Sequence, residues 1–552
     1  MASVRLALAQ TNPVVGDLAG NLDAIFTQVK LSAAEKADIV LFGEMALSGY
    51  PIEDLAQRPA FLQQCEQAVQ DFAQRLLDAG LGGVCVVLGH PARAPAEIQN
   101  GWAIAQNCAS ILLDGEVIGK YAKYHLPNYS VFDEYRIFVP GNESLNFTVN
   151  GINFAVLICE DIWQSGGPVA GLKDSDTDFA LVLNGSPFER GKYQTRVDLV
   201  RQLATDAGCG VAYVNLVGGQ DDLVFDGASI VADSNGVLVL ECESFSESRA
   251  IVEIQGPDKV SASPELPAKQ SDPHGEVWNA LVLGLRDYVF KNGFPSVILG
   301  LSGGIDSAVC AAIAVDAIGS ERVFGVSLPS KYSSDHSKGD AFDLAERLGL
   351  NIRTEAIADM VAVTENQLGL TGVSAENLQA RVRGLILMAL SNAEGHLTLT
   401  TGNKTELAVG YSTIYGDSVG GYAPIKDVPK MLVWELARWR NMQAIRDGKR
   451  PPIPENSIQK PPSAELRPDQ VDQDSLPEYE LLDRILAAYI DERLGRDEII
   501  AQGIDSEVVD RILSLVDRAE WKRRQGAIGP KISGMAFGRD RRMPITNRFI
   551  QR

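Results

Sequence analysis

The sequence lacks the paired cysteines that a disulfide framework or a structural zinc site requires. Its 552 residues include seven cysteines, an odd number scattered along the chain without any C-x-x-C spacing. Both kinds of site need cysteines in regular pairs. We therefore expect reduced thiols. We also expect a cytoplasmic protein, because the first residues, Met1–Gln10, alternate like a strand and lack the long apolar core of an export signal.

Positive charge and long apolar runs are also scarce. The 72 acidic residues outnumber the 50 basic ones, which gives a formal net charge of -22. That charge opposes binding to nucleic acid or to an anionic membrane. No apolar run reaches the length that spans a bilayer, and we find no internal repeat and no heptad array. The partners we expect are small molecules.

What the sequence does contain is typical of a globular α/β protein with two large domains. Hydrophobic residues make up 45% of the chain, and 552 residues exceed one ordinary core. Short apolar runs alternate with helical stretches, such as 21–30 and 61–77, up to about residue 254. The strands expected there are Ile39–Phe42, Val84–Leu88, Ala109–Leu113, Phe154–Ile158, Phe179–Leu183, Val211–Asn215 and Ser229–Ala232.

The periodicity then stops and later resumes, which predicts the domain boundaries. We expect a first domain over residues 1–256, a linker rich in proline and serine over 257–273, and a second domain over 274–552. Strands and helices alternate in the second domain, which predicts a doubly wound parallel sheet. A later stretch, about 448–477, is dense in proline and acidic residues and reads as a surface excursion.

The segment Val297–Ala308 predicts a phosphate-binding turn. An apolar strand runs into a Ser/Gly turn and then a helix, so main-chain N–H groups, hydroxyls and the positive helix end converge on one point. The turn lacks the lysine of a Walker A loop and places Asp306 where a phosphate would bind, so a divalent cation is needed. We expect ATP with Mg2+, although a Ser/Gly turn taken alone is more often an ordinary loop.

The run Ser302-Gly303-Gly304-Ile305-Asp306-Ser307, after a strand and before a helix, resembles the loop of the ATP pyrophosphatases. The resemblance implies a Rossmann-like, adenine nucleotide alpha hydrolase-like domain. It also implies cleavage of ATP to AMP and pyrophosphate, with a carboxylate or a carbonyl-type oxygen activated as an adenylate.

Three residues of the first domain stand where predicted strands end: Glu44, Lys123 and Cys159. Taken singly, such a cysteine is usually part of the core, and such a glutamate or lysine is usually a solvated charge. Together they supply a nucleophile, a base for its proton and a cation for the oxyanion. The trio therefore predicts covalent thiol catalysis.

In order and context the trio resembles that of the nitrilase-family amidases, over essentially residues 1–256. The resemblance implies an αββα sandwich in which Glu44 is the general base, Lys123 stabilises the oxyanion and Cys159 forms the thioester. A second glutamate, Glu134, matches one that orients the lysine, or is a surface charge in a loop. Nitrilase-like domains generally associate, so the resemblance also implies a homo-oligomer.

Three further residues resemble the glutamine pocket of nitrilase-type glutaminases, namely Tyr129, Ser186 and Lys192. Polar groups that hold the amino acid end of glutamine would give specificity, because leaving them unpaired is costly. Without the resemblance, each would be an ordinary loop residue.

The chain as a whole resembles the glutamine-dependent NAD+ synthetases, which join such a glutaminase to an ATP-binding ligase. Further motifs are Asn377–Arg381, Thr400–Glu406, Tyr415–Asp417 and Lys460–Arg467. The resemblance implies ATP-dependent amidation of nicotinic acid adenine dinucleotide (deamido-NAD+) through an adenylate, with ammonia released from glutamine, as the last step of NAD+ biosynthesis.

By position, the resemblance assigns ATP contacts to Leu301, Ser302, Gly303, Gly304, Ile305, Asp306, Ser307, Ala308 and Thr401. It assigns Mg2+ to Asp306 and Glu406, and deamido-NAD+ to Asn377, Glu406 and Lys531. Lys531 lies in a C-terminal segment that reads as flexible, where a lone lysine is usually solvated.

Other glutamine-dependent ligases fit less well. Asparagine synthetases begin with a catalytic cysteine after Met1, whereas residue 2 is alanine. GMP synthetases carry a Cys-His-Glu glutaminase, and none of the five histidines stands in such an arrangement near Cys159. A non-catalytic nucleotide sensor is a further alternative, against which the retention of both sets of reactive residues argues.

Overall fold

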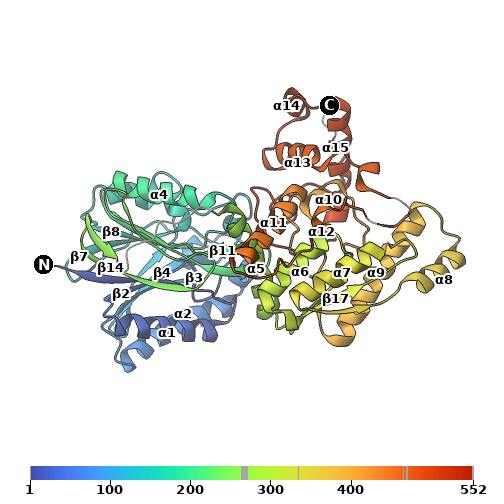
Figure 1. Ribbon diagram of the computed structural model, residues 1–552. Helices are drawn as coiled ribbons and strands as arrows, with labels where there is room; N and C mark the ends of the chain where they lie inside the picture. The colour runs from blue at the N-terminus through green and yellow to red at the C-terminus, as the bar shows by residue number, and fades with distance from the viewer. Residues whose placement is uncertain (1, 263–271, 334, 464, 468–469, 550–552) are drawn as a thin grey trace. The chain divides into compact units, whose positions relative to one another are not determined.

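The computed structural model describes residues 2–262, 272–333, 335–463, 465–467 and 470–549. The chain divides into two compact units (Figure 1). The first contains Met1–Gln220 and Val224–Ser271, and the second contains Asp221–Leu223 and Asp272–Arg552.

The first unit is built on two stacked sheets. Its seven-stranded sheet has the order β15 (Lys259–Ala262), β14 (Ser248–Gly256), β1 (Val4–Gln10), β2 (Ile39–Phe42), β3 (Cys85–Arg93), β4 (Ala105–Leu113) and β5 (Glu116–Ala122). Its six-stranded sheet has the order β13 (Leu238–Glu241), β12 (Ile230–Ala232), β9 (Gly210–Asn215), β8 (Phe179–Asn184), β7 (Ile152–Ile158) and β6 (Asn146–Val149). Two short strands, β10 (Val217–Gln220) and β11 (Leu223–Asp226), pair with each other.

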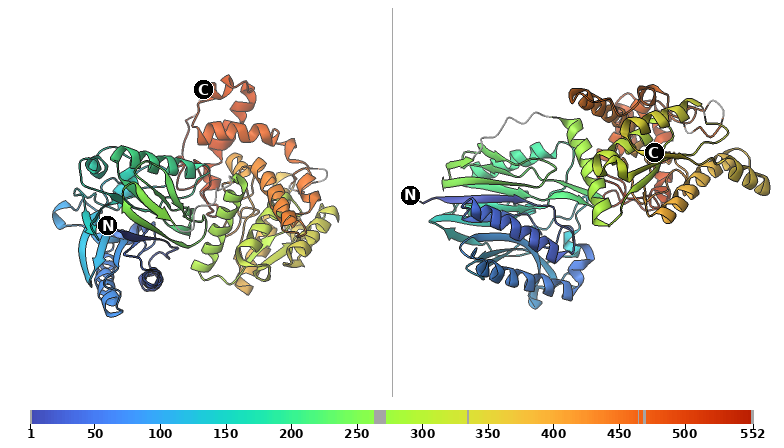
Figure 2. Two further views of the ribbon diagram at one scale, coloured as in Figure 1. Left: turned by 60° about the vertical axis from the view of Figure 1, so that its left-hand side comes forward. Right: turned by 60° about the horizontal axis from the view of Figure 1, so that its bottom comes forward.

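Helices cover the outer face of each sheet, as the right-hand view of Figure 2 shows. Helices α1 (Leu18–Ala34) and α2 (Pro59–Asp78) pack on the first sheet, and α3 (Gly167–Leu172) and α4 (Lys192–Ala207) on the second. The inward faces of both sheets share one core. Burial on both faces explains why central strands such as β8 are nearly continuous apolar runs. The predicted αββα sandwich is confirmed.

The segment expected as a linker is partly a strand. Within 257–273, residues Lys259–Ala262 form β15, which pairs antiparallel with β14. Alternation explains this, because Val260 and Ala262 pack against the core while Lys259 and Ser261 face outward. Residues 263–271 lie outside the described residues.

The second unit contains a parallel four-stranded sheet of order β18 (Asn351–Thr354), β17 (Val323–Ser327), β16 (Val297–Gly300) and β19 (Leu397–Thr398). Its long helices are α5 (Pro273–Lys291), α6 (Ile305–Ile318), α7 (Asp335–Leu348), α8 (Ala358–Leu368), α9 (Val373–Glu394) and α11 (Lys430–Arg446). The predicted α/β class of this domain is confirmed.

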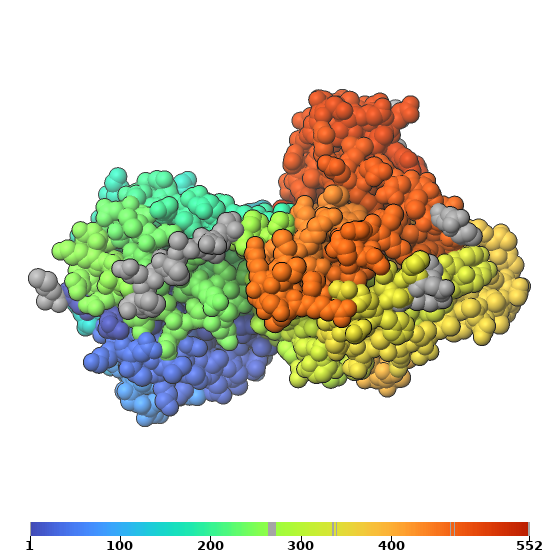
Figure 3. Space-filling model, viewed as in Figure 1, coloured from blue at the N-terminus to red at the C-terminus, as the bar shows by residue number. Residues whose placement is uncertain are grey.

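The C-terminal helices form a cluster with an apolar core of their own. They are α13 (Tyr479–Leu486), α14 (Arg496–Ala501), α15 (Ser506–Arg518) and α16 (Glu520–Arg523), and the short helix α10 (Lys404–Val409) packs against them. Figure 3 shows this part, coloured orange to red, as a lobe that projects from the yellow part of the second unit.

Two expectations for irregular segments differ from the structure. The stretch at 448–477 contains α12 (Glu455–Gln459), and it packs on α11: the Trp434 indole donates to the Ile458 carbonyl at 3.1 Å, and Ile453 is fully buried. Lys531 is also buried, and its ammonium pairs with Asp540 at 3.1 Å. Local polarity misled in both cases, because it does not show which partners lie beside a segment in the folded chain.

Candidate active sites

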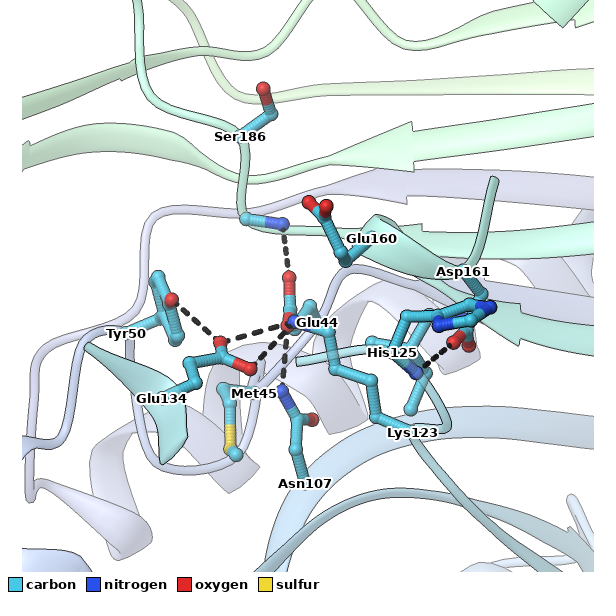
Figure 4. A network of polar contacts seen from close by, with 12 residues as sticks. Glu44, Met45, Tyr50, Asn107, Lys123, His125, Glu134, Glu160, Asp161 and Ser186 are labelled. Carbon is cyan, nitrogen blue, oxygen red and sulfur yellow. Dashed lines mark hydrogen bonds and ion pairs between the residues drawn. The ribbon is translucent and has the colours of Figure 1, made fainter. Parts of the chain in front are cut away.

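The first unit buries a lysine between two carboxylates. Glu44 follows β2, Lys123 follows β5, and Glu134 begins a short 3-10 helix. Lys123 Nζ lies 2.8 Å from Glu44 Oε1 and 2.9 Å from Glu134 Oε2, and each side chain is only 1% exposed (Figure 4). We call these three residues the first-unit trio.

Neighbouring groups hold both carboxylates in place. Asn107 Nδ2 donates to Glu44 Oε1 at 2.6 Å, and the Gly185 amide donates to Glu44 Oε2 at 2.8 Å. The Tyr50 hydroxyl donates to Glu134 Oε1 at 2.8 Å (Figure 4). Every one of these donors favours the ionised carboxylate.

The charges of the trio depend on one another. Burial opposes the charged form of Lys123, but Glu134 and Glu44 outweigh burial and raise its pKa well above the usual value. Burial raises the pKa of Glu134 to about 7, with Lys123 lowering it and Glu44 raising it. The lysine therefore stays an ammonium at neutral pH, while Glu134 titrates there.

Cys159 stands directly after β7, at the first residue of the 3-10 helix η4 (Cys159–Ile162). Its φ of +43° is a left-handed conformation that non-glycine residues adopt rarely. Burial raises the pKa of its thiol well above the usual value; nearby Glu44 raises it further, and Lys123 lowers it. The thiol thus lies within electrostatic reach of both residues and is held in its protonated form.

The three residues expected to bind glutamine lie in different surroundings. The Tyr129 hydroxyl donates to Glu160 Oε2 at 2.9 Å, and the Ser186 amide donates to Asn215 Oδ1 at 2.9 Å. Lys192 begins α4, and its Nζ lies 6.0 Å from the centre of the Trp163 ring. Glu160, a buried acid next to Cys159, was missed by sequence reasoning, because nothing in the local pattern separates it from a solvated charge.

The second unit folds its Ser/Gly turn between β16 and α6. Gly303 has a φ of +77°, and a Cβ there would come within 2.4 Å of the Ser337 carbonyl oxygen. Ser302 Oγ accepts from the Gly304 amide at 3.2 Å and lies 3.1 Å from Ser307 Oγ. These contacts keep the turn tight at the positive end of α6.

A second lysine between two carboxylates stands beside this turn. Lys430 Nζ lies 2.5 Å from Asp306 Oδ2 and 3.0 Å from Glu406 Oε1. Asn403 caps α10 by accepting from the Glu406 amide at 3.0 Å, and its Nδ2 donates to Asp306 Oδ1 at 2.9 Å. We call Asp306, Glu406 and Lys430 the second-unit trio. Lys430 was not among the residues expected from the sequence.

Burial and charge also shape the ionisation of this trio. Burial raises the pKa of Glu406 to about 7, with Lys430 lowering it and Asp306 raising it. For Lys430, burial disfavours the charge, but Asp306 and Glu406 raise the pKa above its usual value. The lysine is therefore a permanent cation between two acids.

A cavity of about 300 Å³ opens beside the second-unit trio. Seven of the expected ligand residues line it, namely Leu301, Ser302, Gly304, Asp306, Ser307, Thr401 and Glu406. Residues of the 448–477 stretch complete the wall, including Ser457, Lys460 and Glu465.

The remaining expected ligand residues do not line this cavity. Gly303, Ile305 and Ala308 belong to the turn and to the buried face of α6. Asn377 accepts a hydrogen bond from the Thr413 hydroxyl at 2.8 Å, and Lys531 pairs with Asp540. The sequence-based assignment of Asn377 and Lys531 to deamido-NAD+ stays a prediction.

The carboxylates of the second-unit trio suit Mg2+. Asp306 and Glu406 offer hard oxygen atoms in the cavity wall, and Mg2+ usually takes one or two carboxylates together with substrate phosphates. Among the described residues, no group of three or more His, Cys, Asp or Glu side chains is placed to hold a metal.

The part of the chain that the structure describes contains no helix with the length and apolar character needed to cross a bilayer.

Comparison with known families identifies two domains in the chain. The model of the carbon-nitrogen hydrolase family matches residues 5–259, and that of the NAD synthase family matches residues 277–526. The molecule is thus a carbon-nitrogen hydrolase domain joined to an NAD synthase domain. Together with the full-length relatives described next, these matches show that the chain belongs to the glutamine-dependent NAD+ synthetases.

The relatives cover nearly the whole chain. The glutamine-dependent NAD+ synthetase of Acinetobacter baylyi is 44% identical over 99% of each chain, and that of Thermotoga maritima is 41% identical over 100% of this chain and 99% of its own. The structure of the Acinetobacter baumannii enzyme in complex with adenosine diphosphate is 42% identical, with a TM-score of 0.77 and 99% coverage of both chains. The Cytophaga hutchinsonii enzyme, 23% identical over 99% of this chain and 98% of its own, shares the fold with a TM-score of 0.81.

Proposed function

We propose that this chain converts deamido-NAD+ to NAD+ with ATP, and that it takes the nitrogen from glutamine. One observation carries the proposal: the same chain holds a buried Glu44–Lys123 pair within electrostatic reach of Cys159, and a Ser/Gly turn with an acidic pair at a cavity. The first arrangement suits release of ammonia from an amide, and the second suits activation of a carboxylate by a nucleotide.

In the glutaminase half, Cys159 attacks the amide carbonyl of glutamine, and Glu44 takes the thiol proton. The raised pKa of Cys159 keeps the thiol protonated at rest, so the proton has to move during the attack. Lys123, held as an ammonium by the two carboxylates, stabilises the oxyanion. Ammonia leaves, and water then releases glutamate from the thioester.

The amino acid end of glutamine needs polar partners. Tyr129, Ser186 and Lys192 are proposed to supply them. The buried carboxylate of Glu160, which already accepts from Tyr129, adds a negative group suited to an α-ammonium. Leaving such groups unpaired is costly, which would favour glutamine over simple amides.

In the synthetase half, the turn and Thr401 are proposed to bind ATP, with donors from the turn and from Lys430 facing the phosphates. Asn377, Glu406 and Lys531 are proposed to bind deamido-NAD+. Asp306 and Glu406 would hold Mg2+, which would neutralise charge on the departing pyrophosphate. The carboxylate of the nicotinate ring attacks the α-phosphorus, and ammonia then displaces AMP.

The remaining expectations belong to the same proposal. They are a homo-oligomer that acts on small molecules alone, a cytoplasmic location, and domains bounded at about 256 and 274. The seven free and buried cysteines support a reducing compartment.

The test separates the two nitrogen sources. Cys159→Ala should abolish glutamine-driven NAD+ formation and leave the ammonia-driven rate unchanged, because it removes only the nucleophile. Cys209→Ala is the matched control. Cys209 is also buried, but it precedes β9, whereas Cys159 follows β7. Loss of both activities in Cys159→Ala, or survival of the glutamine-driven one, would contradict the proposal.

A further inference from the structure

One carboxylate in the first unit joins the two chain segments that carry the reactive groups. Asp161 is fully buried, two residues after Cys159 in the sequence. Its Oδ1 accepts from the main-chain amides of Tyr124 at 3.1 Å and His125 at 2.8 Å, the two residues that follow Lys123. Its Oδ2 accepts from the Ile158 amide at 2.9 Å, the residue before Cys159.

A fourth bond anchors the carboxylate itself. The Tyr121 hydroxyl, near the end of β5, donates to Asp161 Oδ2 at 2.7 Å. The carboxylate thus connects β5 of the seven-stranded sheet with the end of β7 of the six-stranded sheet. Lys123 and Cys159 extend from these two segments, which belong to different layers of the sandwich.

The backbone at Cys159 requires such support. A φ of +43° is unfavourable for a non-glycine residue and persists only where surrounding contacts impose it. The Asp161 bond to the Ile158 amide closes the turn around Cys159 and fixes that conformation.

We propose that Asp161 is a positioning residue for amide cleavage, which sets the thiol of Cys159 against the ammonium of Lys123. Its hydrogen bonds to the amides of Tyr124, His125 and Ile158 act on the main chain next to these two residues. This inference rests on the proposed glutaminase activity. It predicts that Asp161 controls the rate of the chemical step and leaves the affinity for glutamine unaffected.

Asp161→Asn tests this most directly. An amide has one acceptor oxygen, whereas the two oxygens of Asp161 accept main-chain N–H groups on opposite sides. The amide can therefore keep the Lys123 side or the Cys159 side, but not both. Because small displacements of reacting groups cost about 100-fold, we expect kcat for glutamine hydrolysis to fall by about that factor while KM stays within about twofold.

Asp178→Asn is the matched control. The Asp178 carboxylate accepts from the Asn153 amide at 2.9 Å, and so anchors the opposite end of β7. We expect it to keep kcat. Ammonia-driven NAD+ synthesis should be unchanged in both variants, which shows that the rest of the chain is intact.

Two readouts do not depend on glutamine. In Asp161→Asn, alkylation of Cys159 by iodoacetamide should slow at least about tenfold, and amide hydrogen exchange should increase at 124–125 and 158. If the wild-type chain hydrolysed no glutamine, the proposed function would fail while these readouts still tested the role of Asp161.

The role would be disproved by a kcat within about threefold of wild type in Asp161→Asn, or by an equal loss in Asp178→Asn. If Asp161→Asn does not fold, Tyr121→Phe replaces it, because it removes one donor and leaves the three main-chain bonds. There we expect about a threefold loss in kcat at constant KM, and an unchanged kcat would overturn the inference.

Discussion

The two ionic trios share one arrangement and differ in how far water reaches them. In the first-unit trio, Lys123 and both of its carboxylates are 1% exposed. In the second-unit trio, Lys430 is also 1% exposed, but the side chains of Asp306 and Glu406 are 20% and 18% exposed and line a cavity.

This difference in exposure means that the positive charge of the first-unit trio is fixed, whereas that of the second-unit trio can be partly replaced by another cation. Two buried carboxylates without a cation are costly, so the first-unit trio depends on its lysine. In the second-unit trio, water or a metal ion can reach the carboxylates from the cavity and take over part of the neutralisation by Lys430. The closed trio suits a reaction that needs a permanent local charge, and the open one suits a substrate that arrives with its own cation.

The largest effect should come from removing a carboxylate of the open trio. Asp306→Asn should lower NAD+ synthesis by at least about 1,000-fold with either nitrogen source, because both the cation site and the turn lose a charged group. Glutamine hydrolysis measured alone should persist. Steady-state assays of NAD+ and of glutamate would check this.

Asp316→Asn is the control for that variant. Asp316 lies on the same helix with a side-chain exposure of 24%, but it pairs with Arg440 and does not line the cavity. Near-normal synthesis in Asp306→Asn would show that this carboxylate has no part in nucleotide chemistry.

The next largest effect should be a difference in stability when the lysine of each trio is replaced. Lys123→Met leaves two sealed carboxylates unpaired and should destabilise the first unit by about 3–5 kcal/mol. Lys430→Met should cost about 1–2 kcal/mol, because its carboxylates remain partly hydrated. Added Mg2+ should recover part of the loss in Lys430→Met alone. Calorimetric unfolding with and without Mg2+ measures both, and equal losses would refute the distinction.

Part of each site was predictable from local sequence. Glu44 and Cys159 each follow an apolar strand, and the sequence shows where such strands end. Lys123 follows β5, most of whose residues are exposed or half-buried, so its strand is less evident from the sequence. The Ser/Gly turn was equally visible, because its conformation depends on glycine at Gly303. The fold class and the family membership are confirmed.

The site residues that were not predicted lie far in the sequence from the residues that they contact. Lys430 reaches Asp306 across 124 positions, and Asn107 reaches Glu44 across 63, so no short motif contains either pair. Contacts of this kind depend on strand order and helix packing, which a single sequence indicates only in outline.

The smallest expected effect is on the pH dependence of the two activities. Each trio contains a glutamate whose pKa is raised to about 7, Glu134 in the first unit and Glu406 in the second. Below that pH Glu134 is protonated, so Lys123 binds Glu44 alone and weakens it as a base. Hydrolysis of glutamine should therefore rise as pH increases through about 7, at any Mg2+ concentration. Glu406 faces the cavity, where Mg2+ competes with the proton.

Raising Mg2+ should thus move the acidic limb of ammonia-driven synthesis to lower pH, by up to about one unit per tenfold increase. The profile is measured with total ammonia adjusted to keep the concentration of NH3 constant. The limb for glutamine hydrolysis should stay in place, because no cation from solution reaches a side chain that is 1% exposed. If the acidic limb of the pH profile for glutamine hydrolysis moved with Mg2+, the first-unit trio would be accessible to cations from solution. The proposed difference between the two sites would then be wrong.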